Sequence, residues 1–121
     1  MSAGQVRIGS IVIDCTDFPK MMAFWQGALR YVPREPAEPG WVVLKDPEGR
    51  GPNVSLNLTS EGPAPTYRLH LDLYTSDQPG EVERLLRLGA RMHRPADEKG
   101  DFVTLADPDG NVFCVVQKEA K

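Results

Sequence analysis

The chain has 121 residues, 40% of them hydrophobic and 26% charged, which is typical of one globular domain. Its formal net charge of −3 gives no basic stripe, so nucleic acid is not expected as a partner. No apolar run approaches the roughly 18 residues of a membrane span, and the N-terminus lacks the pattern of a signal peptide, so we expect no membrane partner.

The first half of the chain predicts a strand, a helix and three more strands. Residues 8–15 carry the period-2 pattern of a half-buried strand. Asp17 is a good N-cap and Pro19 a first-turn residue for a helix that continues to about residue 29. The three further strands are expected near 30–35, at 41–45 and at 54–59.

The second half predicts the same order of elements. A strand at 68–75 precedes a helix that begins at Asp77. Three strands then follow near 90–94, at 102–106 and at 112–117. Residues 60–66, rich in Pro, Gly and Ala, read as a linker. The chain is therefore one domain, 1–121, with module one at 6–59 and module two at 67–118.

Matching segments at a nearly constant offset indicate that the two modules are duplicates. IGSIVIDCTD (8–17) aligns with RLHLDLYTSD (68–77), and GWVVLKDPEG (40–49) aligns with DFVTLADPDG (101–110). The two Asp-Pro-x-Gly segments at the ends of the second pair are typical of type I turns.

Side-chain alternation assigns the strand residues to two faces. One face is apolar, as the two amphipathic helices require of the sheet that they cover. It consists of Ile11, Ile13, Val42, Leu44, Val54, Leu56, Leu58, Leu71, Leu73, Val103 and Leu105.

The opposite face is polar and aromatic, which is more typical of a cavity lining than of a core or a plain solvent face. Val43 and Thr104 share it. The residues expected to line a ligand cavity between the modules are Ser10, Val12, Asp14, Trp41, Ser55, Asn57, His70, Asp72, Tyr74, Phe102 and Cys114.

These segments resemble the vicinal oxygen chelate superfamily, which includes glyoxalase I, bleomycin-binding proteins and extradiol dioxygenases. The matching features are HLDLYTSD (70–77), LRLGAR (86–91) and DFVTLADPDGNVFCVVQ (101–117). The resemblance implies an α+β fold, in which two βαβββ modules in tandem form a cup-shaped mixed sheet with helices on its outer face. The chain looks closest to the short glyoxalase-like domains, and the resemblance also implies a homodimer.

In the catalytic members of the superfamily, a divalent ion is held by side chains from the first and last strand of each module. The resemblance carries these positions onto Ser10, His70, Cys114 and Ser55, or onto Asn57 in place of Ser55 if the register slips by one pleat. Only His70 is a strong ligand of the expected type, whereas a catalytic metal generally has about three protein ligands. We therefore expect no cofactor; a divalent metal, if one binds, would use His70 with Asp72 or Cys114.

Three residues are candidates for catalysis, namely Asp14, His70 and Asp72. In a partly dry cavity, desolvation and mutual repulsion would separate the pKa values of the two aspartates. The alternative is that each carboxylate is bound to a neighbouring hydroxyl, backbone N–H group or arginine. Cys114 could act as a nucleophile with His70 as its base, although a packed small side chain is the simpler interpretation.

The first functional hypothesis is a small-molecule-binding protein, similar to glyoxalase and bleomycin-resistance proteins, with a degenerate metal site and an acidic cavity wall that favours a neutral or cationic ligand. One alternative is a metal-dependent lyase, isomerase or dioxygenase of the same superfamily. Another is a metal-free acid/base enzyme using Asp14, Asp72 and His70, and a third is a protein interaction or regulatory domain whose cup is vestigial and filled by side chains. Two cysteines that need not pair suit a cytoplasmic protein.

Overall fold

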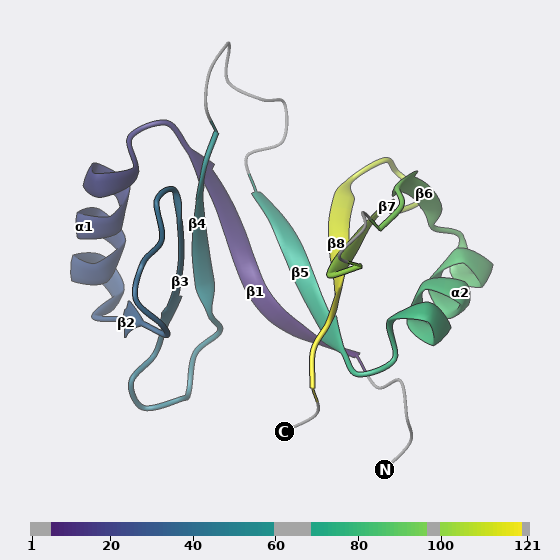
Figure 1. Cartoon of the computed structure of the whole chain (residues 1–121), viewed down its shortest axis with the longest axis horizontal. Coiled ribbons are helices and arrows are strands. Elements are labelled where there is room, and N and C mark those ends of the chain that lie inside the picture. The colour runs from purple at the N-terminus through teal and green to yellow at the C-terminus, as the bar shows by residue number, and fades with distance from the viewer. Residues whose placement is uncertain (1–5, 60–68, 97–99, 120–121) are drawn as a thin grey trace. The chain divides into compact units, whose positions relative to one another are not determined.

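A computed structural model describes residues 6–59, 69–96 and 100–119 (Figure 1). The linker expected at 60–66 lies outside the described residues. The elements are β1 (Val6–Cys15), α1 (Phe18–Leu29), β2 (Val32–Pro33), β3 (Trp41–Lys45), β4 (Val54–Leu58), β5 (Leu69–Thr75), α2 (Gln78–Leu88), β6 (Arg91–Arg94), β7 (Phe102–Ala106) and β8 (Val112–Gln117). This order confirms an α+β fold class with two βαβββ modules.

The strands of the two modules pair in the same way. In module one the order is β2-β3-β4-β1, with β1 parallel to β4 and the other pairs antiparallel. In module two the order is β6-β7-β8-β5, with β5 parallel to β8 and the other pairs antiparallel. The repeated topology is the one that a duplicated sequence predicts.

The described residues divide into two compact units that nearly coincide with the modules. Residues within Ser10–Leu69 form one unit. Residues within His70–Lys121 form the other, together with the part of β1 that ends at Gly9. The first strand of the chain is therefore divided between the two units.

Helix α1 begins and ends with clear local signals. The Asp17 carboxylate accepts a hydrogen bond from the Lys20 backbone N–H at 3.2 Å, and Pro19 lies in the first turn. Arg30 ends the helix in the left-handed conformation, with φ of 61°. The strand that follows has only two residues, Val32 and Pro33, and is shorter than predicted, although the Arg34 N–H still donates to the Val43 carbonyl at 2.7 Å.

The core of module one lies between α1 and its sheet. Val42, Leu44 and Leu56 are buried there. Side chains from α1, including Met22 and Trp25, pack against them. Leu58, at the end of β4, was expected in this core, but 42% of its surface is exposed because it lies beyond the cluster under α1.

The core of module two is built in the same way. The Asp77 carboxylate caps α2 by accepting from the Gly80 N–H at 3.2 Å. Residues of α2 then pack on strands β7 and β8, where the buried members are Val103, Leu105 and Val115. Leu71 was also expected here, but it is 38% exposed, because α2 covers β7 and β8 rather than the beginning of β5. Each helix lies beside the strands of its own module (Figure 1).

Tyr74 on β5 packs directly over the backbone of Gly9. A Cβ atom at Gly9 would lie 2.3 Å from the tyrosine ring, which no side chain tolerates without a shift. Cations of Arg7 and Lys118 each lie 5.4 Å from the ring centroid, within the range of cation–π attraction. Glycine is therefore required at this point of β1 by close approach.

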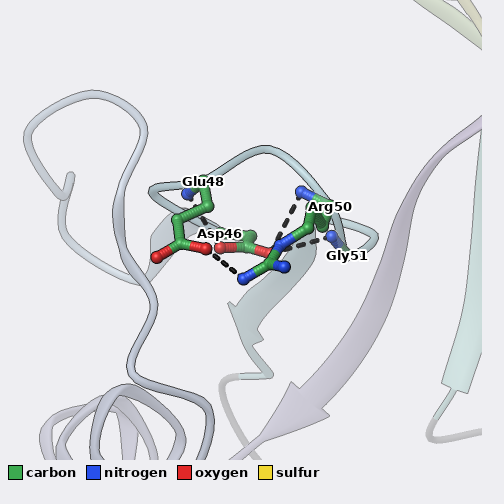
Figure 2. A network of polar contacts seen from close by, with 4 residues as sticks. All are labelled: Asp46, Glu48, Arg50 and Gly51. Atoms are coloured by element: carbon green, nitrogen blue, oxygen red, sulfur yellow. Dashed lines mark hydrogen bonds and ion pairs between the residues drawn. The ribbon is translucent and has the colours of Figure 1, made fainter.

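The turn after β3 shows how the repeated Asp-Pro-x-Gly segment folds. The Gly49 N–H donates to the Asp46 carbonyl at 2.9 Å, as in a type I turn. The Asp46 carboxylate accepts from the N–H groups of Glu48, Arg50 and Gly51 (Figure 2). An ion pair between Arg50 and Glu48 crosses the same turn (Figure 2). These bonds lower the pKa of Asp46, the one from Glu48 contributing most. The segment is a structural turn, as predicted.

Neither helix among the described residues has the length and apolar character that crossing a bilayer requires.

Candidate functional site

Three neighbouring strands of module two bring four polar side chains together. His70 and Asp72 lie two residues apart on β5, so they share a face. Cys114 on β8 lies opposite Asp72, and Thr104 on β7 lies opposite Cys114. We call these four residues the module-two cluster.

The polar atoms of the module-two cluster are close enough to interact. His70 Nε2 lies 3.5 Å from Asp72 Oδ1. One donor atom from each of His70, Asp72 and Cys114 lies within 4.8 Å of the other two. The Thr104 hydroxyl lies 3.6 Å from Cys114 Sγ. The side chains of His70 and Asp72 are 21% and 13% exposed, so both are largely buried but still reach solvent.

The surroundings of His70 favour its charged form. The hydrogen bond to Asp72, followed by the interaction with Cys114, outweighs burial and raises the pKa of His70 to about 10. At neutral pH the side chain is therefore an imidazolium. It can donate hydrogen bonds and supply a proton, but it does not serve as a general base there.

The corresponding positions in module one hold a different set of residues. Val12 lies opposite Ser55, as Asp72 lies opposite Cys114, so the equivalent of Cys114 is Ser55 and not Asn57. The equivalent of Thr104 is Val43, which also lies opposite Ser55.

In the module-one set, the two polar side chains are buried and bind each other. The hydroxyl oxygens of Ser10 and Ser55 are 2.6 Å apart, and both residues are fully buried. The flanking Val12 and Val43 are buried as well. Because both hydroxyls are fully buried and the other two positions are apolar, the module-two set is the one of these two sets that keeps partly exposed polar side chains.

The other residues predicted for the cavity lie on the expected face of their own module. Asp14 accepts a hydrogen bond from the Asn57 side-chain amide at 3.2 Å, so this carboxylate is paired, although by none of the groups named as its expected partners. Trp41 lies opposite Asn57 and is half-buried. Phe102 is 44% exposed. A cavity shared by the two modules stays a prediction.

The superfamily resemblance implies a metal site with ligands from both modules, and the described residues of this chain do not fit such a site. Module one offers two mutually bonded serine hydroxyls where the superfamily has imidazole, amide or carboxylate ligands. Module two offers one nitrogen, one oxygen and one sulfur donor, a set suited to a thiophilic ion such as Zn²⁺ rather than to Mg²⁺ or Mn²⁺. His70 would also have to lose its proton before it could bind any ion.

Sequence patterns alone do not reveal the role of Thr104. Alternation places it on the correct face, but its contact with Cys114 depends on the pairing register of β7 and β8. Register follows from the turn between the strands, and the matched Asp-Pro-Asp-Gly turn is the signal that could have predicted it.

Comparisons with known proteins agree with this fold. Residues 10–116 match a protein family described as a glyoxalase-like domain. A search of curated proteins finds no significant match.

Several solved structures are similar to the chain in fold. A hypothetical protein from Bacillus halodurans C-125 superposes with a TM-score of 0.72 at 14% identity, covering 97% of each chain. Methylmalonyl-CoA epimerase from Mycobacterium tuberculosis gives a TM-score of 0.68 at 13% identity, covering 93% of this chain and 88% of the epimerase. A glyoxalase/bleomycin resistance protein/dioxygenase superfamily member from Vibrio splendidus 12B01 gives 0.62 at 16% identity, covering 96% and 100%. At such identities the likeness establishes the fold alone.

Proposed function

Because the chain belongs to the glyoxalase-like domain family, we propose that it binds a small molecule at the module-two cluster, without the metal ion that superfamily enzymes hold between their modules. The observation that carries this proposal is the contrast between the two copies of one site. Module one has closed its copy with a buried serine pair and two valines. Module two keeps four polar side chains with part of their surface exposed.

The charges of the cluster favour a neutral ligand. The His70 imidazolium and the Asp72 carboxylate offer one donor and one acceptor with balanced charge. A ligand with a carbonyl or hydroxyl oxygen for His70 and an N–H or O–H group for Asp72 satisfies both. An anionic ligand would meet the Asp72 carboxylate at close range and lose that advantage.

Nuclear magnetic resonance of the full chain tests the proposal directly. A library of neutral, cationic and anionic fragments is titrated while backbone amide signals are followed. We expect neutral fragments to shift the signals of Asp72, Thr104 and Cys114 rather than those of the Asp46 turn. Shifts confined to other surfaces would contradict the proposal.

A matched pair of variants gives the energetic test. Asp72→Asn removes a charged acceptor, and such hydrogen bonds contribute about 1.5–3 kcal/mol, so affinity for a fragment that binds the cluster should fall roughly tenfold or more. Asp109→Asn changes an exposed turn residue of the same module and should leave affinity unchanged. Equal affinities for the two variants would reject Asp72 as a ligand contact.

A metal-dependent enzyme is the second candidate, favoured by the three donor atoms within 4.8 Å of one another. Elemental analysis of the purified protein separates the two candidates. A tightly bound stoichiometric ion that is lost in both His70→Gln and Cys114→Ser would establish the second candidate and overturn the first.

We also propose that the protein forms a homodimer in the cytoplasm. This proposal is supported by the family resemblance alone. Light scattering coupled to size exclusion should give twice the mass of the chain, and a monomeric mass at micromolar concentration would reject it.

A further inference from the structure

The two cysteines of the chain occupy contrasting environments. Cys15 on β1 is 3% exposed, and burial, followed by the charges of Asp14 and Asp17, raises its pKa. Cys114 on β8 is only half-buried. Both are free thiols, so the chain contains a sheltered thiol and an accessible one.

The neighbours of Cys114 are those that nucleophilic chemistry requires. On one side β5 presents His70 and Asp72, and on the other side β7 presents Thr104. Asp72 contacts the imidazole at 3.5 Å and Thr104 contacts the sulfur at 3.6 Å. A cation close to a sulfur atom stabilises its thiolate, and a hydroxyl nearby can donate to it.

We propose that Cys114 is a nucleophile that captures α,β-unsaturated carbonyl compounds as covalent thioether adducts. The inference rests on the proposed function, because the compound must first bind at the module-two cluster. It adds a chemical class of ligand and a covalent step.

The step balances without an oxidant or a second thiol. The Cys114 proton leaves to water, and the sulfur electron pair forms a bond to the β-carbon of the ligand. The carbon–carbon π bond breaks, and its electrons move toward the carbonyl oxygen as an enolate. His70 donates its proton to the enolate and regains one from water, so the net change is addition of S–H across the double bond.

This class of ligand suits the cluster better than the other partners of a thiol. Disulfide formation needs a second thiol, and the only other cysteine of the sequence is the buried Cys15. Displacement of a halide needs no proton donor, whereas an enolate does, and His70 is a proton donor held within 4.8 Å of the sulfur. Tyr74 follows His70 and Asp72 on the same face of β5, and its ring packs on Gly9.

N-ethylmaleimide, a small α,β-unsaturated imide, is a suitable probe for the wild-type chain. Adducts are followed by mass spectrometry with peptide mapping, which reports Cys15 and Cys114 separately. We expect a single adduct at Cys114. We also expect it to form faster than on a synthetic peptide of residues 110–118, although the thiol is half-buried in the folded chain. A native rate equal to or below that of the peptide would overturn the proposal without need of any variant.

Variants of the two histidines then test the role of the cation. His70→Gln should slow the reaction of Cys114 by about tenfold or more, while His70→Lys, which keeps a positive charge, should retain most of the rate. His93→Gln, at an exposed position on β6, serves as the matched control and should react like the wild type. Equal rates in His70→Gln and wild type would reject the proposal.

Two further outcomes separate the covalent step from the binding function. Reversible fragment binding at the cluster with no accelerated adduct would reject the covalent step and leave the proposed function standing. Protection of Cys114 by one equivalent of Zn²⁺ that copurifies with the protein would reject both, because the cluster would then be a metal site.

Discussion

At the scale of the residue, His70 links the candidate site to the stability of the fold. Its pKa is raised from 6.5 to about 10 by Asp72 and then by Cys114, so the folded chain binds this proton more tightly than the unfolded chain does. The resulting stabilisation is fully present below pH of about 6.5 and is lost as the pH rises towards about 10.

The same residue scale gives a pH-dependent prediction. Between about pH 7 and pH 10 the melting temperature of the wild type should fall more than that of His70→Gln, because the variant lacks the group that loses its proton. Thermal melts followed by circular dichroism measure the two slopes. His93→Gln should follow the wild type. Parallel curves for wild type and His70→Gln would show that the imidazolium is not stabilised by its neighbours.

Gly9 provides a test of close packing at a single position. Gly9→Ala places a methyl group 2.3 Å from the Tyr74 ring, and such overpacking costs about 1–3 kcal/mol in the free energy of unfolding. Gly27→Ala on α1 is the matched control, because nothing lies within 4 Å of its added Cβ, and it should stabilise the helix by about 0.5–1 kcal/mol. Urea denaturation measures both. Two changes of the same sign would refute this account of Gly9.

At the scale of the element, local patterns predicted the type and order of every helix and strand. Capping aspartates located both helices, with a first-turn proline as a second signal for the first helix, and period-2 alternation located the strands. Register was harder, because the choice between Ser55 and Asn57 depends on how β1 pairs with β4. Burial also depends on which strands a helix covers, and for this reason Leu58 and Leu71 were wrongly placed in the core.

The capping residues give the prediction that belongs to this scale. Asp17→Ala and Asp77→Ala each remove a carboxylate that accepts a backbone N–H in the first turn of a helix. Each should lower the free energy of unfolding by about 0.5–2 kcal/mol. Glu83→Ala, an exposed residue within α2, is a control expected to change stability by less than about 0.5 kcal/mol. Denaturant titration of the three variants checks the order. Loss of stability at Glu83 as large as at the caps would contradict it.

At the scale of the whole molecule, the described residues form two hydrophobic cores of similar design. Leu44 in module one and Leu105 in module two are both fully buried and occupy equivalent positions. Truncating either to alanine should cost about 2–5 kcal/mol. Leu88→Ala, at a position 68% exposed, should cost less than about 0.5 kcal/mol. Hydrogen exchange adds a spatial test, since each core variant should first lose protection in its own module. Protection lost only in the opposite module would contradict separate cores.

The duplication could be predicted from the sequence. The different side-chain contacts of its two copies could not. Aligned segments establish that Ser10 and His70 are equivalent positions, but not that Ser10 is closed off by a hydrogen bond while His70 faces Asp72. That difference arises from side-chain contacts across strands that are distant in the chain. The polar character of the face was predicted, and its concentration in module two is a result of the structure.

The division of β1 between the two compact units has a consequence for synthesis on the ribosome. Residues of β1 from Ile11 onward can pair with β4 as soon as β4 has emerged, because β4 precedes residues 60–66 in the chain. The earlier residues of the same strand must wait for Tyr74 and the later strands before they find their place. The first described residues of β1 thus reach their place later than the rest of the strand, although they are synthesised before it.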